Sequence, residues 1–300
     1  MKRLIFLFAG AFLLAAPAAQ ATLRVLACEP EWAALTRELA GELAAVDAAT
    51  TALQDPHRIE ARPSLLAKAR RADLMVCTGA GLEAGWLPLL QREAGNGRIQ
   101  AGQPGYFEAA REVSLLDRPV RLDRALGDVH AAGNPHVHLD PRRLATIAAA
   151  LAGRLAQIDP ANAARYAECN ADFQARWRAA MTRWEARAAP LKGMPVVVHH
   201  KGLTYLADWL GLEVVGDLEP KPGVEPSAAH LAALLDTLER RPARLILRSA
   251  YQSPRPAQWL ADKAAIAAVE LPYTVGGAPG TDDLFGLFEV TLSRLLQAAP

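Results

Sequence analysis

Hydrophobic patterns typical of strands and of helices alternate along both ends of the chain. In the first half, short apolar runs predict strands, and amphipathic segments between them predict helices. The predicted strands are Leu23–Ala27 and Leu74–Cys77, and the helices lie near Glu31–Gly41, Ser64–Arg71 and Leu82–Gln91. In the second half, strands are predicted at Pro195–His199, Leu212–Val215, Ala243–Arg248 and Ala267–Leu271, with helices between them. This alternation indicates α/β architecture with mainly parallel sheets flanked by helices.

The middle of the chain has a different pattern, because almost no strand signal occurs from Pro141 to about Ala188. Two alanine-rich helical stretches are separated there by Asp159-Pro160. The second stretch, 161–188, carries Tyr166, Phe173, Trp177, Met181 and Trp184 at spacings of three, four and seven, which predicts one buried face. At 1.5 Å per residue such a helix reaches about 40 Å, enough to connect two lobes.

These patterns predict a bilobal protein with a removable leader. The expected divisions are a signal peptide at 1–21, an N-terminal α/β lobe at 22–158, a linking helix at 159–190 and a C-terminal α/β lobe at 191–300. Ser64, Ser227 and Thr281 are expected to be helix N-caps.

The first 21 residues have the composition of a secretory signal. Lys2 and Arg3 precede an apolar run, and Ala19-Gln20-Ala21 forms a small-residue cleavage site, so we expect a periplasmic mature chain beginning at Thr22. Val25-Leu26-Ala27-Cys28 loosely resembles a lipidation box, but Arg24 interrupts it and the segment is typical of a strand. No later segment approaches the roughly 20 apolar residues of a membrane-spanning helix.

Charge and cysteine content narrow the function classes. Removing the leader changes the balance from 33 basic and 32 acidic residues to 31 and 32, so neither sign dominates. This argues against nucleic acid or an anionic membrane surface as the main partner. Cys28 and Cys77 both end predicted strands that can lie side by side in a parallel sheet, which predicts a disulfide in an oxidising compartment and leaves Cys169 as a thiol.

A glycine-rich segment, Gly79-Ala80-Gly81-Leu82-Glu83-Ala84, matches a dinucleotide fingerprint. It lies in the second β-α unit rather than the first, and an exported protein rarely meets a nicotinamide cofactor. We interpret it as a turn between strand and helix.

Histidines in three separated segments are candidate metal ligands. They occur in Asp55-Pro56-His57, Asn134-Pro135-His136 and Val198-His199-His200, and Asp282-Asp283 follows near the end. Neutral imidazoles with one carboxylate form a tetrahedral donor set that suits zinc. His138 is an alternative to His136. Because neighbouring strand residues point to opposite faces, only one of His199 and His200 is expected to bind.

Other interpretations of these residues remain open. Acidic residues at the start of a helix are favoured by the helix dipole whatever the function, so Asp282 and Asp283 also have a structural explanation. His130 is expected to be exposed or capping, and His230 to lie on the surface.

The motifs together resemble the zinc/manganese solute-binding proteins of bacterial ABC importers over essentially the whole mature chain. The resemblance rests on the segments Leu53-Gln54-Asp55-Pro56-His57 with Arg62-Pro63-Ser64, 134–141, 200–212, Glu219-Pro220-Lys221-Pro222-Gly223 and Thr281-Asp282-Asp283-Leu284. It implies two lobes joined by one long rigid helix, with a metal in the cleft between them. The family ligands then map onto His57, His136, His200 and Asp282, with Asp283 as the alternate carboxylate.

The function implied is capture of zinc and delivery to a membrane ABC permease, without enzymatic activity. Three imidazoles favour zinc, and manganese remains an alternative cargo. A monomer is expected, with a metallochaperone as a further candidate partner. Binding needs neutral histidines, so affinity should fall below about pH 6.5. The segment 118–133 holds only His130, so this chain lacks the long histidine-rich loop of some zinc-specific members.

Two rival functions are a secreted zinc hydrolase and an adhesin on the same scaffold. A hydrolase would use three histidines, a metal-bound water, and Glu60 or Glu225 as general base. An adhesin would bind no metal.

Overall fold

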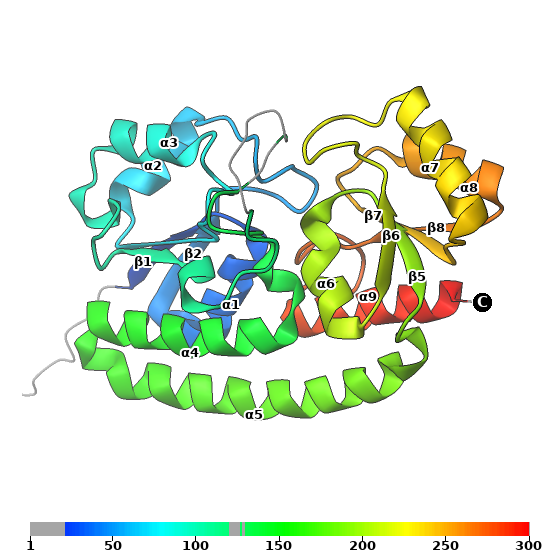
Figure 1. The fold of residues 1–300 in the computed structure, drawn as a ribbon. Helices are drawn as coiled ribbons and strands as arrows, with labels where there is room; N and C mark the ends of the chain where they lie inside the picture. The colour runs from blue at the N-terminus through cyan, green and yellow to red at the C-terminus, as the bar shows by residue number, and fades with distance from the viewer. Residues whose placement is uncertain (1–21, 120–126, 128–129, 300) are drawn as a thin grey trace, which may run out of the picture.

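Two four-stranded parallel sheets form the centres of two lobes in the computed structural model, which describes residues 22–119, 127 and 130–299 (Figure 1). The first sheet has the strand order β2-β1-β3-β4, and the second has the order β6-β5-β7-β8. Every strand pair in these two sheets is parallel. The strands are β1 Leu23–Ala27, β2 Ala44–Ala48, β3 Leu74–Cys77, β4 Tyr106–Glu108, β5 Pro195–Val198, β6 Glu213–Asp217, β7 Leu245–Ser249 and β8 Ala267–Leu271. The predicted α/β class is confirmed.

Helices cover both sheets, as parallel strands buried on both faces require. In the N-terminal lobe α2 and α3 pack on one face of the sheet, and α1, α4 and α5 on the other. In the C-terminal lobe α7 and α8 pack on one face of β5 and β7. The helices are α1 Pro30–Ala40, α2 Pro63–Arg71, α3 Leu87–Ala94, α4 Pro141–Ile158, α5 Ala163–Ala188, α6 Thr204–Leu210, α7 Ala228–Arg240, α8 Pro254–Ala264 and α9 Leu284–Ala298.

The alternation of side chains along each strand assigns residues to separate cores. Leu26 and Met75 face α2 and α3, whereas their neighbours Val25 and Val76 face a core shared with α1, α4 and α5. The same shared core takes in β5 and β7 of the second sheet and extends to α9. The lobes are therefore joined by continuous apolar packing as well as by the chain.

The long helix α5 runs beneath both lobes and joins them (Figure 1). Its expected aromatic face is buried: Phe173 stacks on Trp177 at 5.1 Å between ring centroids, and Trp184 stacks on Phe288 of α9 at 5.2 Å. Trp177 also contacts Phe285 at the start of α9. Aromatic contacts thus hold α9 against α5.

Some local predictions were wrong, for reasons visible in the structure. β2 and β4 were missed, because β2 is only partly buried and β4 has three residues. Helix α3 begins at Leu87 rather than Leu82, since Gly79, Ala80 and Gly81 have positive φ and form the expected glycine-rich turn.

The predicted helix caps were partly right. Ser227 caps α7, accepting a hydrogen bond from the amide of His230. Ser64 does not cap α2, because Pro63 already occupies the first turn and Arg62 is the N-cap. Asp283, not Thr281, caps α9 by accepting from the amide of Gly286 at 2.7 Å.

The predicted disulfide is confirmed. Cys28 and Cys77, at the carboxyl ends of β1 and β3, are bonded with a Cα–Cα separation of 4.7 Å, and Cys169 is free and half-buried. Cys28 is therefore not a lipid acceptor in this structure. The predicted signal peptide, 1–21, lies outside the described residues. Within the described part of the chain, no helix has the length and apolar character needed to cross a membrane.

Candidate metal centre

His57, His136 and His200 converge from three separate parts of the chain. One ligand atom from each lies within 4.8 Å of the others. Their ring centroids are 5.4 Å apart for His57 and His136, 5.8 Å for His57 and His200, and 5.4 Å for His136 and His200. His57 is half-buried, and the other two are buried. The structure thus brings together one histidine from each of the three predicted motifs.

The backbone explains this convergence. His200 follows β5 directly, and His57 lies in the loop after β2, so both come from the carboxyl ends of parallel strands. This edge is the usual ligand-binding side of an open α/β sheet. His136 lies in the connection that precedes α4.

The spacing of the three rings matches a tetrahedral ion. A Zn–N distance of about 2.0–2.1 Å places the centroids of two bound imidazoles about 5 Å apart. The Nε2 atom of His57 is buried and has no hydrogen-bond partner, which leaves its lone pair available for a cation. The residues present therefore fit a zinc ion.

Each of the three rings is held at its other nitrogen. Nδ1 of His57 is 2.7 Å from Oδ1 of Asp55, and Nδ1 of His200 is 2.7 Å from Oε2 of Glu219. Nδ1 of His136 is hydrogen bonded to the hydroxyl of Tyr273. When Nδ1 carries the proton, the lone pair of Nε2 is free to bind a metal. Hydrogen-bond partners at Nδ1 fix both the tautomer and the orientation of the ring.

Burial and the charges of neighbouring histidines favour the metal-binding form of His136. Burial, together with the neighbouring histidines His57 and His200, holds the pKa of His136 well below its usual value, so this imidazole is neutral. Burial opposes ionisation of Asp55, but its hydrogen bonds with His57 outweigh this and lower the pKa of Asp55. The neutral imidazole is the form that binds a metal.

The alternative histidines, His138 and His199, lie outside this group. His138 is fully buried, with Nε2 2.9 Å from the carbonyl of Tyr273 and Nδ1 3.4 Å from Oε1 of Glu31. His199 is buried, and burial lowers its pKa to about 4. Neither joins the converging group.

His130, expected to be exposed or capping, is not exposed. It is half-buried, and its ring stacks on His57 at 5.4 Å and lies 6.2 Å from His136. No recognisable motif surrounds His130 in the sequence. His230 is half-buried, with Nε2 2.9 Å from the carbonyl of Asp217.

Asp282 and Asp283 are not brought to the three histidines. Neither belongs to the group whose ligand atoms lie within 4.8 Å. Asp282 is exposed, and the side chain of Asp283 is used as the N-cap of α9. The start of α9 is held against the aromatic face of α5, because Phe285 contacts Trp177.

Sequence reasoning did not identify the partners of the histidines. Asp55 lies two residues before His57, and Glu219 lies within a quoted motif; these positions were the available signals. Tyr273 follows β8, and nothing in its local sequence marks it.

A family model described as "Zinc-uptake complex component A periplasmic" matches residues 25–298. The high-affinity zinc uptake system protein ZnuA of Paracoccus denitrificans is 26% identical, with 95% of this chain and 93% of the relative covered. ZnuA of Bacillus subtilis is 23% identical over 86% of this chain and 80% of the relative.

Solved structures show the same fold. A crystal structure of ZnuA has a TM-score of 0.75 at 22% identity, covering 93% of this chain and 99% of that one. A manganese-bound periplasmic metal-binding protein from Candidatus Liberibacter asiaticus has a TM-score of 0.74 at 16% identity, covering 92% of this chain and 99% of that one. Because the family model spans nearly the whole described chain, the protein belongs to the family of the periplasmic component A of zinc-uptake complexes.

Proposed function

We propose that the protein is a periplasmic receptor that captures zinc and delivers it to an ABC import permease. The observation that carries this proposal is the convergence of three histidines, each with Nδ1 hydrogen bonded and one nitrogen left for a cation. The relatives named for zinc uptake support the same cargo. His57, His136 and His200 are the proposed ligands.

Zinc is the proposed cargo rather than manganese. The converging group contains imidazoles and no carboxylate, whereas manganese favours oxygen donors. Asp282 is left out of the proposed ligand set because the structure keeps it exposed and outside the group. Three histidines leave a fourth position on a tetrahedral ion, to be filled by another group or by solvent.

The ion is proposed to be carried rather than used in catalysis. A zinc hydrolase needs a general base fixed close to the metal-bound water. Glu60 and Glu225, the candidates for that role, are both exposed, although Glu225 lines a pocket shared with His57 and His200. Export by a cleaved leader at 1–21, a monomeric state and loading by a metallochaperone belong to the same proposal.

The test is zinc content and affinity of the mature chain, measured by mass spectrometry and calorimetry. Wild type should bind one zinc, and His57→Ala, His136→Ala and His200→Ala should each lose most of the affinity. His230→Ala is the matched control and should bind like wild type, because His230 contacts the carbonyl of Asp217 instead. A wild-type chain that binds no zinc, or single histidine variants that bind as wild type does, would overturn the proposal.

A further inference from the structure

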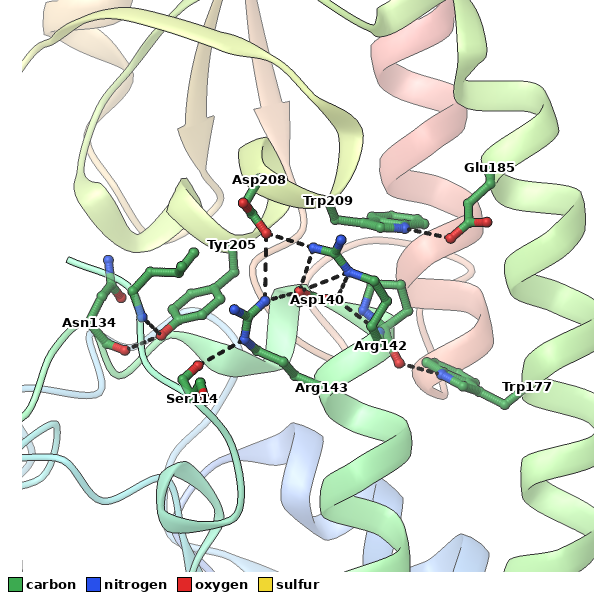
Figure 2. A network of polar contacts seen from close by, with 12 residues as sticks. Ser114, Asn134, Asp140, Arg142, Arg143, Trp177, Glu185, Tyr205, Asp208 and Trp209 are labelled. Carbon is green, nitrogen blue, oxygen red and sulfur yellow. Dashed lines mark hydrogen bonds and ion pairs between the residues drawn. The ribbon is translucent and has the colours of Figure 1, made fainter. Parts of the chain in front are cut away.

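A network of polar contacts joins the segment that carries His136 to the segment that carries His200 (Figure 2). It consists of Asn134, Asp140, Arg142, Arg143, Tyr205 and Asp208, and we call it the interlobe clamp. The first four residues flank or begin α4, and the last two lie on α6. Asn134 is two residues before His136, and α6 begins four residues after His200.

Asn134 connects the two ligand segments directly through its side-chain amide. Its Oδ1 accepts from the backbone amide of His136 at 3.0 Å, and its Nδ2 donates to the carbonyl of Lys201 at 2.8 Å. Asn134 is buried, so each of these hydrogen bonds replaces contact with water. The backbone positions of His136 and His200 are therefore tied through one side chain.

Tyr205 adds a second connection on the same side of the site. Its hydroxyl donates to the carbonyl of Asn134 at 2.6 Å and accepts from the amide of Leu116 at 2.9 Å. The guanidinium of Arg143 lies 4.7 Å from the centre of the Tyr205 ring. Helix α6 is thereby held to the loop that leads into His136.

Asp140 is the buried charge at the centre of the clamp. Its carboxylate caps α4, accepting from the amide of Arg142 at 2.8 Å and from its Nη2 at 2.9 Å, and it also accepts from Arg143. A buried carboxylate is tolerated only when it is paired in this way. The same Nη2 of Arg142 donates to Asp208 at 2.6 Å, and Nη1 of Arg143 lies 3.7 Å from Asp208. Figure 2 shows these contacts running from α4 to α6.

We propose that the interlobe clamp positions His136 and His200 and so sets how fast the site releases its ion. This inference rests on the proposed zinc site. Asn134 and Tyr205 fix the two ligand segments. The Arg142–Asp208 ion pair joins α4 to α6 on the exposed side of the clamp. Outer contacts that orient ligands typically change metal affinity by about 10- to 100-fold when they are removed. Weakening the clamp should therefore leave all three ligands in place but speed zinc dissociation.

The decisive variant is Asn134→Asp, which keeps the size of the side chain. The new carboxylate can still accept from the amide of His136, but it cannot donate to Lys201, and it faces Asp117, whose Oδ2 is 3.1 Å from Nδ2 of Asn134. Zinc release into a chelator should become about tenfold faster or more, with one zinc still bound per chain. Asp208→Asn should give a smaller increase. Tyr205→Phe, which removes only the hydroxyl, replaces Asn134→Asp if that variant does not fold.

Two controls separate positioning from general destabilisation. Asp172→Asn removes an exposed ion pair with Arg176 on α5, at 2.7 Å, and should not change the release rate. Leu90→Ala removes a fully buried side chain of α3 and should lower the melting temperature without changing zinc release. Clamp variants that release zinc at the wild-type rate, or a Leu90→Ala variant that is accelerated as strongly, would overturn the inference. A wild-type protein without zinc would contradict the proposed function instead.

Discussion

The two sheets have the same strand order and direction, yet their carboxyl edges carry different chemistry. At the carboxyl edge of the N-terminal sheet, the disulfide between Cys28 and Cys77 ties β1 to β3, and the carboxyl groups of Glu29 and Glu83 are buried beside it. At the carboxyl edge of the C-terminal sheet, β5 leads into His200, whose ring is hydrogen bonded to Glu219 after β6. Tyr273 follows β8 at the same edge. The central strands of the first sheet thus end in covalent and buried polar contacts, whereas the central strand β5 of the second sheet leads to a proposed ligand.

At the carboxyl edge of the N-terminal sheet, the buried side chains are hydrogen bonded to one another and to the backbone. Oε1 of Glu83 accepts from the amide of Thr78 at 2.7 Å, and the hydroxyl of Thr78 donates to Glu29 at 3.1 Å. This lobe contributes His57 from the loop after the outer strand β2 instead. Topology thus offers two equivalent edges, and the side chains decide which central strand supplies a ligand.

The largest expected effect on stability comes from removing the disulfide at the carboxyl edge of the N-terminal sheet. The bond closes a chain segment with a sequence separation of 49 residues, for which loop-closure entropy predicts a loss of about 4 kcal/mol in the free energy of unfolding. Denaturant unfolding of the Cys28→Ala/Cys77→Ala variant measures this loss. Cys169→Ala is the control, since Cys169 is free. Equal midpoints for wild type and the double variant would show that the edge is closed without the covalent bond.

The next largest effect should come from the proton on Glu83. Burial raises the pKa of Glu83 to about 7, and burial also raises that of Glu29, with the charges of Glu83 and Glu31 adding to it. The folded chain therefore holds a proton that the unfolded chain loses above about pH 4.5. The resulting stabilisation is complete below about pH 4.5 and is lost as the pH rises through about 7.

Unfolding of metal-free wild type and Glu83→Gln across pH 4.5 to 8 tests this expectation. The stability of wild type relative to the variant should decrease by on the order of 3 kcal/mol over that range. His199, with a pKa lowered to about 4, has the opposite pH dependence, but it is present in both proteins and cancels in the difference. Glu29 does not cancel, because the charge of Glu83 contributes to its raised pKa, so the difference reports the two glutamates together. A difference that stays constant with pH would mean that this pair of glutamates holds no extra proton in the folded chain.

The same contrast explains what the sequence could predict. Strand and helix periodicity identified the class, most of the central strands and the buried face of α5, because these depend on local patterns. Adjacent parallel strands that end in Cys28 and Cys77 were enough to predict their disulfide. The convergence of the three histidines was expected only through the family resemblance, since their motifs are 60 or more residues apart and local spacing cannot show that they meet.

Other features of the site depend on tertiary packing alone. His130 stacks on His57 although no motif marks it, and Tyr273, which follows β8, is hydrogen bonded to His136. Asp282 and Asp283 have the local pattern of both a ligand and a helix start. The packing of Phe285 on Trp177 holds the start of α9 against α5, and Asp283 is the N-cap of α9.

At the C-terminal edge, Glu219→Gln should weaken zinc binding by about 10- to 100-fold, because the neutral amide is a poorer partner for Nδ1 of His200. Glu219 also accepts from the amide of Gly223 at 2.9 Å, so its carboxylate is fixed on two sides. Calorimetric titration with zinc measures the change. Glu213→Gln, on β6 and in an exposed ion pair with Arg241, is the control and should bind as wild type does. Equal affinity for Glu219→Gln and wild type would remove Glu219 from the site.

The smallest effect separates the two neighbouring aspartates at the start of α9. Asp283→Ala removes the N-cap and should lower the free energy of unfolding by about 1 kcal/mol. Asp282→Ala, at an exposed position one residue earlier, should leave stability nearly unchanged. Both variants should bind one zinc with wild-type affinity, because neither carboxylate belongs to the converging group. Loss of zinc from Asp282→Ala alone would show that the start of α9 moves to the histidines when the ion binds, and that the fourth ligand comes from the C-terminal lobe.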